Sequence, residues 1–167
     1  MKKIFFISII FILSFSFLVA CNIKEISRPS EDAYLELFKH LLGDFTNEWV
    51  LQQKYIAIDL TNVLYEHPDR IQKVIEDHME NYHFMIIWDD MSGLIESGYI
   101  TVCEYGDPES FVDGFLVTFN DVELNKNDLI TNASVWYGNL GASGAKYTVS
   151  NVRGEWIVKE PETVWVS

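Results

Sequence analysis

The stretch Gly144-Ala-Lys-Tyr-Thr-Val-Ser-Asn-Val-Arg-Gly-Glu-Trp-Ile-Val158 carries the clearest structural signal in the chain. Residues 145–152 and 155–166 are strand-like runs in which β-branched and aromatic residues recur. Arg153-Gly154 separates the two runs, and a two-residue connection that contains glycine is typical of a tight hairpin turn. This part of the sequence therefore predicts an antiparallel hairpin near the end of the chain.

Three further strand-like runs precede the hairpin, at residues 99–105, 111–122 and 129–138. Turn-forming segments separate the strands: Gly106-Asp-Pro108, Asn125-Lys-Asn-Asp128 and Gly141-Ala-Ser-Gly144. Short links between successive strands predict an antiparallel meander of five strands. Gly114, inside one of the runs, predicts a bulge or bend.

The first half of the chain has helical periodicity. Amphipathic helices are predicted at residues 31–42, which Gly43 ends, and at 68–82, which Pro68 begins. A strand-like run at 54–60 separates them, residues 89–96 indicate a short third helix, and residues 83–90 fit a strand as well as a helix. Helices followed by strands predict an α+β domain over residues 30–167, with the helices on one face of a curved antiparallel sheet.

The final hairpin resembles the last hairpin of the nuclear-transport-factor-like superfamily, which includes ketosteroid isomerases and many bacterial lipoproteins. The matching positions are structural: Tyr147, Val149, Gly154, Trp156 and Val158. The resemblance implies a cone-like fold, a bent sheet wrapped on a helix around an apolar pocket. That fold serves enzymes, binding proteins and scaffolds alike, so it does not select a function.

The N-terminus has the features of a secretory signal. Met1-Lys2-Lys3 precedes an apolar run that ends in Leu18-Val-Ala-Cys21. Those four residues resemble the lipobox of bacterial lipoproteins, in which the cysteine is acylated and becomes the new N-terminus. The expected organisation is a lipoprotein signal peptide over residues 1–20 and a lipidated tether over 21–29. An uncleaved anchor and free secretion are the alternatives.

The mature chain would carry 25 acidic and ten basic side chains, a net charge of −15, because Lys2 and Lys3 leave with the signal. A polyanion is repelled by nucleic acid, which excludes that class of partner. Anionic lipid repels it too, so the lipid anchor at Cys21 would hold the protein on the extracytoplasmic face of the cell membrane. A cationic protein or peptide, or a small apolar ligand, is the expected partner.

With Cys21 acylated, Cys103 has no partner for an intramolecular disulfide. Its strand-like surroundings predict an inert, buried side chain.

Asp121, Glu123 and Asn125 alternate as ligands do in calcium loops. Lys126 stands where such a loop needs glycine, so a solvated hairpin tip is favoured over a metal site. No cofactor is expected. The stretch from Gly138 to Lys146 matches neither glycine-rich phosphate loops nor a nucleophile elbow.

Acid–base chemistry has only weak support. Asp77 with His78, or Asp89 with Asp90, would have to act as a pair, and a charged helix surface explains these residues as well. Glu76, Asp77 and Glu80 indicate an exposed acidic helix face. The sequence therefore favours a membrane-anchored, non-catalytic binding or accessory module. A small hydrolase or isomerase with Asp/His acid–base residues, or an acidic immunity or inhibitor protein, is the alternative.

Overall fold

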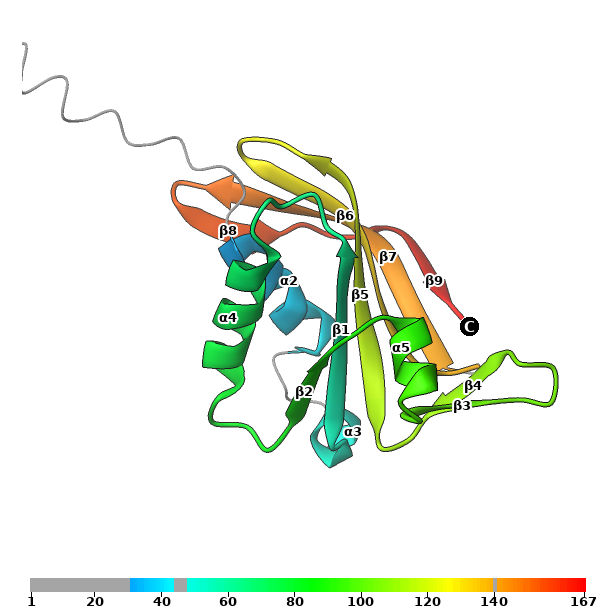
Figure 1. Cartoon of the computed structure of the whole chain (residues 1–167). Helices are drawn as coiled ribbons and strands as arrows, with labels where there is room; N and C mark the ends of the chain where they lie inside the picture. Colours follow the sequence, from blue (N-terminus) through cyan, green and yellow to red (C-terminus); the bar gives the residue numbers. More distant parts are fainter. Residues whose placement is uncertain (1–30, 44–47, 140) are drawn as a thin grey trace, which may run out of the picture.

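The computed structural model describes residues 31–43, 48–139 and 141–167 (Figure 1). These residues form an α+β fold, in which a strongly curled sheet is accompanied by a few helices, as the sequence predicts. Cys21, the expected signal peptide and the tether lie outside the described residues. No helix within the described ranges is long and apolar enough to cross a membrane.

The two predicted amphipathic helices are confirmed. The described helices are α2 (Glu31–Leu41), α3 (Glu48–Gln52), α4 (Pro68–Met79) and α5 (Met91–Glu96). α4 ends three residues earlier than the predicted 82, and the Asp90 carboxylate caps α5 by accepting a bond from the Gly93 N–H at 2.9 Å. α3 was not predicted, because five residues are too few to show helical periodicity.

The strands are β1 (Tyr55–Asn62), β2 (Met85–Trp88), β3 (Ile100–Val102), β4 (Pro108–Phe111), β5 (Gly114–Leu124), β6 (Asp128–Gly138), β7 (Gly141–Val152), β8 (Glu155–Val158) and β9 (Glu162–Val166). The strand alternative for residues 83–90 is thus correct. Gly114 begins β5 instead of bending it, and the irregularity of this strand lies between Asp121 and Glu123.

The sheet has the order β2-β1-β5-β6-β4-β3, and β7 pairs with β6, β8 and β9. The β5–β6–β7 meander is antiparallel, as predicted. The prediction of an entirely antiparallel sheet is wrong, because β1 is parallel to both β2 and β5. The physical reason is the crossover: α4 carries the chain back between β1 and β2, so both strands run in the same direction.

The predicted strand 155–166 is two strands that lie one after the other along β7. β8 pairs with residues 149–152 of β7, and β9 pairs with residues 143–146. Pro161 lies between them, where its ring removes a backbone donor from any continuous ladder.

The predicted turn at 141–144 is also wrong, because these residues begin β7. Their small size makes room for aromatic rings. A Cβ atom on Gly141 would lie 1.8 Å from the Tyr137 ring, and one on Gly144 would lie 2.6 Å from the Trp165 ring.

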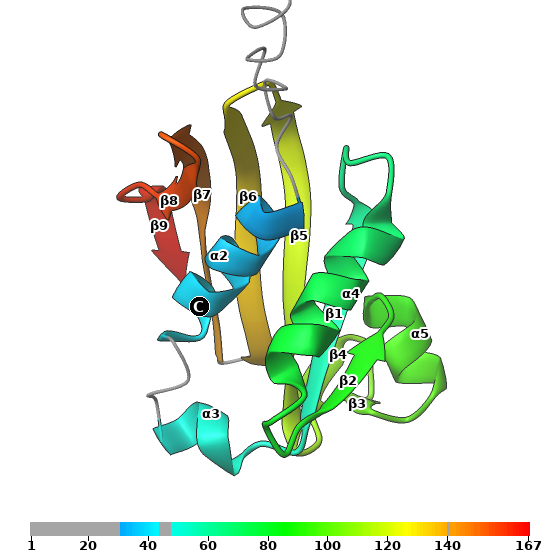
Figure 2. The same ribbon diagram turned by 90° about the vertical axis from the view of Figure 1, so that its left-hand side faces the viewer.

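Helices cover both faces of the sheet, which corrects the prediction of a single covered face. α2 and α4 lie across the concave face (Figure 2), where Leu37, Ile71 and Phe115 belong to the larger hydrophobic core. α5 packs on the opposite face, where Leu94 meets Ala57 and Leu116 in a smaller core. Alternate residues of β1 and β5 therefore contribute to different cores.

The three hairpin residues that the sequence predicts to be structural, Tyr147, Gly154 and Trp156, lie at different places in the β7–β8 hairpin. Arg153 and Gly154 both have positive φ, 58° and 96°, the geometry of a tight two-residue hairpin turn. Tyr147 is 9% exposed in the larger core, whereas Trp156 is half-buried at its edge.

Candidate functional site: a pocket at the end of helix α2

A pocket of about 580 Å³ opens where α2 ends. Its lining comes from α2 and the residues that follow it, from α3, and from β6 and β7: His40, Leu41, Leu42, Gly43, Trp49, Val50, Val135, Tyr137 and Ser143. This volume lies within the range of small-molecule sites, and the lining is mainly aliphatic and aromatic, as in most such sites.

Local structure explains why this end of the fold is hollow. α2 stops at Leu41, and Gly43 follows with φ +59°, a conformation that allows the chain to leave the helix axis. On the sheet side, Val135 and Ser143 face each other in the β6–β7 ladder, and both line the pocket together with Tyr137. The pocket therefore lies between the end of a helix and the β6–β7 ladder.

Two aromatic rings form one wall of the pocket. Trp49 and Tyr137 have ring centroids 4.7 Å apart, and Trp49 also lies 5.6 Å from the core ring of Phe115. Tyr137 is 42% exposed, so a bound apolar group would cover aromatic surface that water now contacts.

The polar side chains of the described lining are His40, Tyr137 and Ser143, and no carboxylate is among them. The imidazole of His40 makes an edge contact with the ring of Tyr147 at 5.7 Å, which fixes its position above β7. The described lining therefore offers hydrogen-bonding groups that can orient a ligand, and it contains no carboxylate that could act together with His40.

The other end of α2 is closed by hydrogen bonds. The hydroxyl of Tyr34, a fully buried residue, donates to Asp121 Oδ2 at 2.5 Å, and the Leu64 N–H donates to the same oxygen at 2.8 Å. Tyr65 donates to Glu31 Oε2 at 2.6 Å, and this bond lowers the pKa of Glu31. α2 is thereby joined to β5 and to the segment before α4.

Asp121 is the most unusual ionisable group of the described residues. Its Oδ1 and the Oγ1 of Thr131 are both buried, and the two residues are partners in the β5–β6 ladder, but their oxygens do not reach good hydrogen-bond geometry. Burial raises the pKa of Asp121, and the bonds from Tyr34 and Leu64, with the nearby Thr131 hydroxyl, oppose this effect only in part. Burial likewise raises the pKa of Tyr34.

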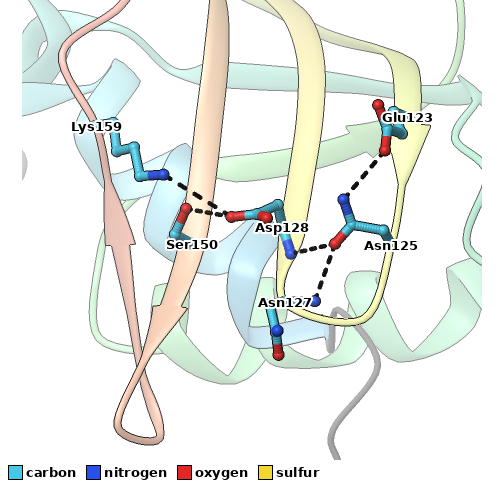
Figure 3. A network of polar contacts seen from close by, with 6 residues as sticks. All are labelled: Glu123, Asn125, Asn127, Asp128, Ser150 and Lys159. Atoms are coloured by element: carbon cyan, nitrogen blue, oxygen red, sulfur yellow. Dashed lines mark hydrogen bonds and ion pairs between the residues drawn. The ribbon is translucent and has the colours of Figure 1, made fainter.

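The structure sets Asp121 apart from Glu123 and Asn125, the other two weak metal candidates. Asp121 bonds to α2, whereas Glu123 accepts a bond from Asn125 at 3.1 Å at the β5–β6 turn (Figure 3). Asn125 Oδ1 accepts from the backbone N–H groups of Asn127 and Asp128, and Asp128 in turn accepts from Ser150. Within the described residues, no three His, Cys, Asp or Glu side chains form a group that could hold a metal ion.

The proposed acid–base pairs lie away from the pocket. Asp77 and His78 are on α4, where Asp77 forms an ion pair with Lys73 at 2.9 Å. Asp90 caps α5, and the adjacent Asp89 accepts a bond from the Asp90 N–H. Glu76, Asp77 and Glu80 are exposed, as predicted for an acidic helix face.

Cys103 follows β3 and is half-buried, so the prediction of a buried strand residue is wrong. The hairpin turn begins directly after Val102, and this turn exposes Cys103 more than a central strand position would.

The pocket residues share no motif or spacing along the sequence that predicts them as a group. Trp49 lies on the unpredicted α3, and Ser143 lies in the segment predicted as a turn. One feature of the sequence that points to this region is the set of small residues at 141–145. Such residues allow aromatic rings to approach closely, but they are equally typical of a turn. Comparisons of the chain with protein-family models, curated proteins and solved structures found no match.

Proposed function

We propose that this chain is a membrane-anchored extracytoplasmic lipoprotein, and that its pocket binds an apolar group of a ligand or partner without catalysing a reaction. The anchoring part of the proposal rests on Lys2-Lys3, the apolar run and the lipobox-like Leu18-Val-Ala-Cys21. The binding part rests on the pocket. Likeness to the nuclear-transport-factor-like superfamily remains part of this proposal and agrees with a curled sheet on a helix.

The observation that carries the binding function is the composition of the lining. Leu41, Leu42, Val50 and Val135 surround the aromatic pair of Trp49 and Tyr137, and no carboxylate, lysine or arginine accompanies the imidazole of His40 in the described lining. Acid–base catalysis usually relies on a second ionisable side chain in a convergent position. The described lining supports recognition over catalysis.

A neutral fluorescent probe tests the pocket. N-Phenyl-1-naphthylamine brightens in apolar surroundings, and its lack of charge avoids repulsion by the acidic protein. We expect saturable binding to the wild-type protein and a loss of at least about tenfold in affinity for Ser143→Trp, whose indole would fill the pocket from β7. Ser92→Trp, at an exposed position on α5, is the matched control and should bind as the wild type does. Equal binding by both variants would remove the pocket from the proposal.

The anchor has its own test. Mass spectrometry of protein purified from bacterial membranes should show a mature N-terminus at Cys21 with attached acyl chains. An intact Met1 or an unmodified Cys21 would contradict the anchor and leave the pocket unaffected.

A further inference from the structure

Strand β9 is the outermost strand beside the pocket. In the described sheet it pairs with β7 and with no other strand. All five of its residues are exposed, and Val164, Trp165 and Val166 are 63%, 46% and 77% accessible. Such an edge presents unpaired backbone groups and apolar side chains to solvent, which is the usual template for adding another strand.

The hydrogen-bond pattern shows which backbone groups are unpaired. Ala142 and Ser167 exchange both N–H···O bonds, at 3.4 and 2.9 Å, so they form a hydrogen-bonded pair of the antiparallel ladder. Bonded and non-bonded pairs alternate along such a ladder. Val166, opposite Ser143, is therefore in a non-bonded pair, and its N–H and C=O point away from β7.

The same pairing connects this edge to the pocket. Directly opposed residues of a ladder place their side chains on the same face of the sheet. Ser143 lines the pocket, so Val166 lies on the pocket side of β9. Trp165 lies on the other face, with its ring against Gly144.

We infer that the β9 edge and the pocket form one composite site for an extended polypeptide segment, which pairs with β9 through its backbone and inserts a side chain into the pocket. This inference rests on the proposed binding function and names its partner class. An added strand would run about 10 Å from Ser143, two strand spacings away. A long aromatic side chain on its pocket-facing side points towards the pocket mouth and suits the mainly apolar lining.

Charge determines the kind of segment. The chain has a net charge of −13, and Glu160 and Glu162 lie at the start of the edge, while Glu48 precedes Trp49 on α3. Lys146 pairs with Glu162 at 3.7 Å, whereas Glu48, beside Trp49, and Glu160, before β9, are exposed carboxylates. A basic segment with apolar or aromatic residues at alternate positions complements both the charge and the pocket.

The test uses a nonapeptide that alternates lysine with phenylalanine, and a glutamate–phenylalanine peptide as the acidic control. We expect the basic peptide to bind the full chain, and Val166→Pro to weaken this binding about three- to tenfold, because proline removes the N–H on the free edge. Val166→Ala keeps that N–H and should remain within about twofold of the wild type. Since the β7 bonds come from Trp165 and Ser167, the proline leaves the strand paired.

Several results would overturn the inference. One is equal binding by Val166→Pro and Val166→Ala, and another is equal binding of the two peptides. A wild-type dimer that Val166→Pro dissociates would assign the edge to a second copy of the chain. If N-phenyl-1-naphthylamine still binds while the proline has no effect, the pocket function stands and the composite site fails.

Discussion

The two ends of helix α2 differ in how they meet the sheet. At the N-terminal end, Tyr34 and Glu31 are tied by hydrogen bonds to Asp121 and Tyr65, and aromatic rings fill the remaining space. At the C-terminal end, the helix stops above a pocket of about 580 Å³. The contrast agrees with the proposed function, in which one end of α2 stabilises the fold and the other receives a ligand on a rigid scaffold.

The largest expected effect is on the closed end. Phe119 is 1% exposed and makes an edge contact with Tyr34 at 5.9 Å. Phe119→Ala should lower the free energy of unfolding by about 3–5 kcal/mol, because it leaves a cavity in a packed core. Leu51→Ala, at an exposed position on α3, should cost less than about 1 kcal/mol. Urea denaturation of both variants measures the difference, and similar losses would contradict the contrast between the ends.

A smaller effect is expected at the edge of the same core. Trp156 is half-buried on β8, so Trp156→Ala should cost about 1–3 kcal/mol, less than a fully buried aromatic residue. Thermal unfolding gives the value. A loss as large as that of Phe119→Ala would mean that β8 belongs to the centre of the core.

The pH dependence of stability tests the polar network. The pKa of Asp121 is raised in the folded state, so its contribution is present below the unfolded pKa of about 3.9 and is lost as pH rises through the folded value. Asp121→Asn keeps the shape and an acceptor for Tyr34 and the Leu64 N–H. The free energy of unfolding of the wild type minus that of the variant should therefore fall as pH rises from 4. A difference that grows with pH would show that the hydrogen bonds outweigh burial.

The smallest expected effect is the influence of salt on the binding of a basic partner. Binding of a basic partner should weaken with salt, mainly through slower association, because exposed charges beyond about 8 Å are screened near physiological ionic strength. Stopped-flow measurements with the lysine–phenylalanine peptide at two salt concentrations test this. Salt-independent association would leave the charge of −13 with a role in solubility alone.

Sequence patterns predicted the elements that depend on local periodicity. The apolar stripe of α2, the alternation in β1 and the Arg153-Gly154 turn each specify their own structure. Parallel pairing of β1 depends on a crossover between distant segments, which no local pattern contains. Small residues at 141–144 fit a turn and a strand beneath aromatic rings equally well, and only packing by Tyr137 and Trp165 decides between them.

The pocket was harder to predict than the fold, since its lining joins residues from 40 to 143. His40 had no distinguishing motif, and the acidic residues that drew attention as metal or acid–base candidates lie elsewhere. Asp121 was singled out for its spacing, but its burial against Tyr34 arises from tertiary structure.

The most direct test of the pocket as the binding site is a ¹H–¹⁵N spectrum of the five tryptophan indole groups during titration with N-phenyl-1-naphthylamine. Trp49 lines the pocket, whereas Trp88 bonds to Glu76 on α4 and Trp136 packs with the smaller core on the opposite face. We predict that the Trp49 indole signal shifts with saturation while those of Trp88 and Trp136 stay in place. Shifts at Trp88 or Trp136 with an unchanged Trp49 would contradict the account.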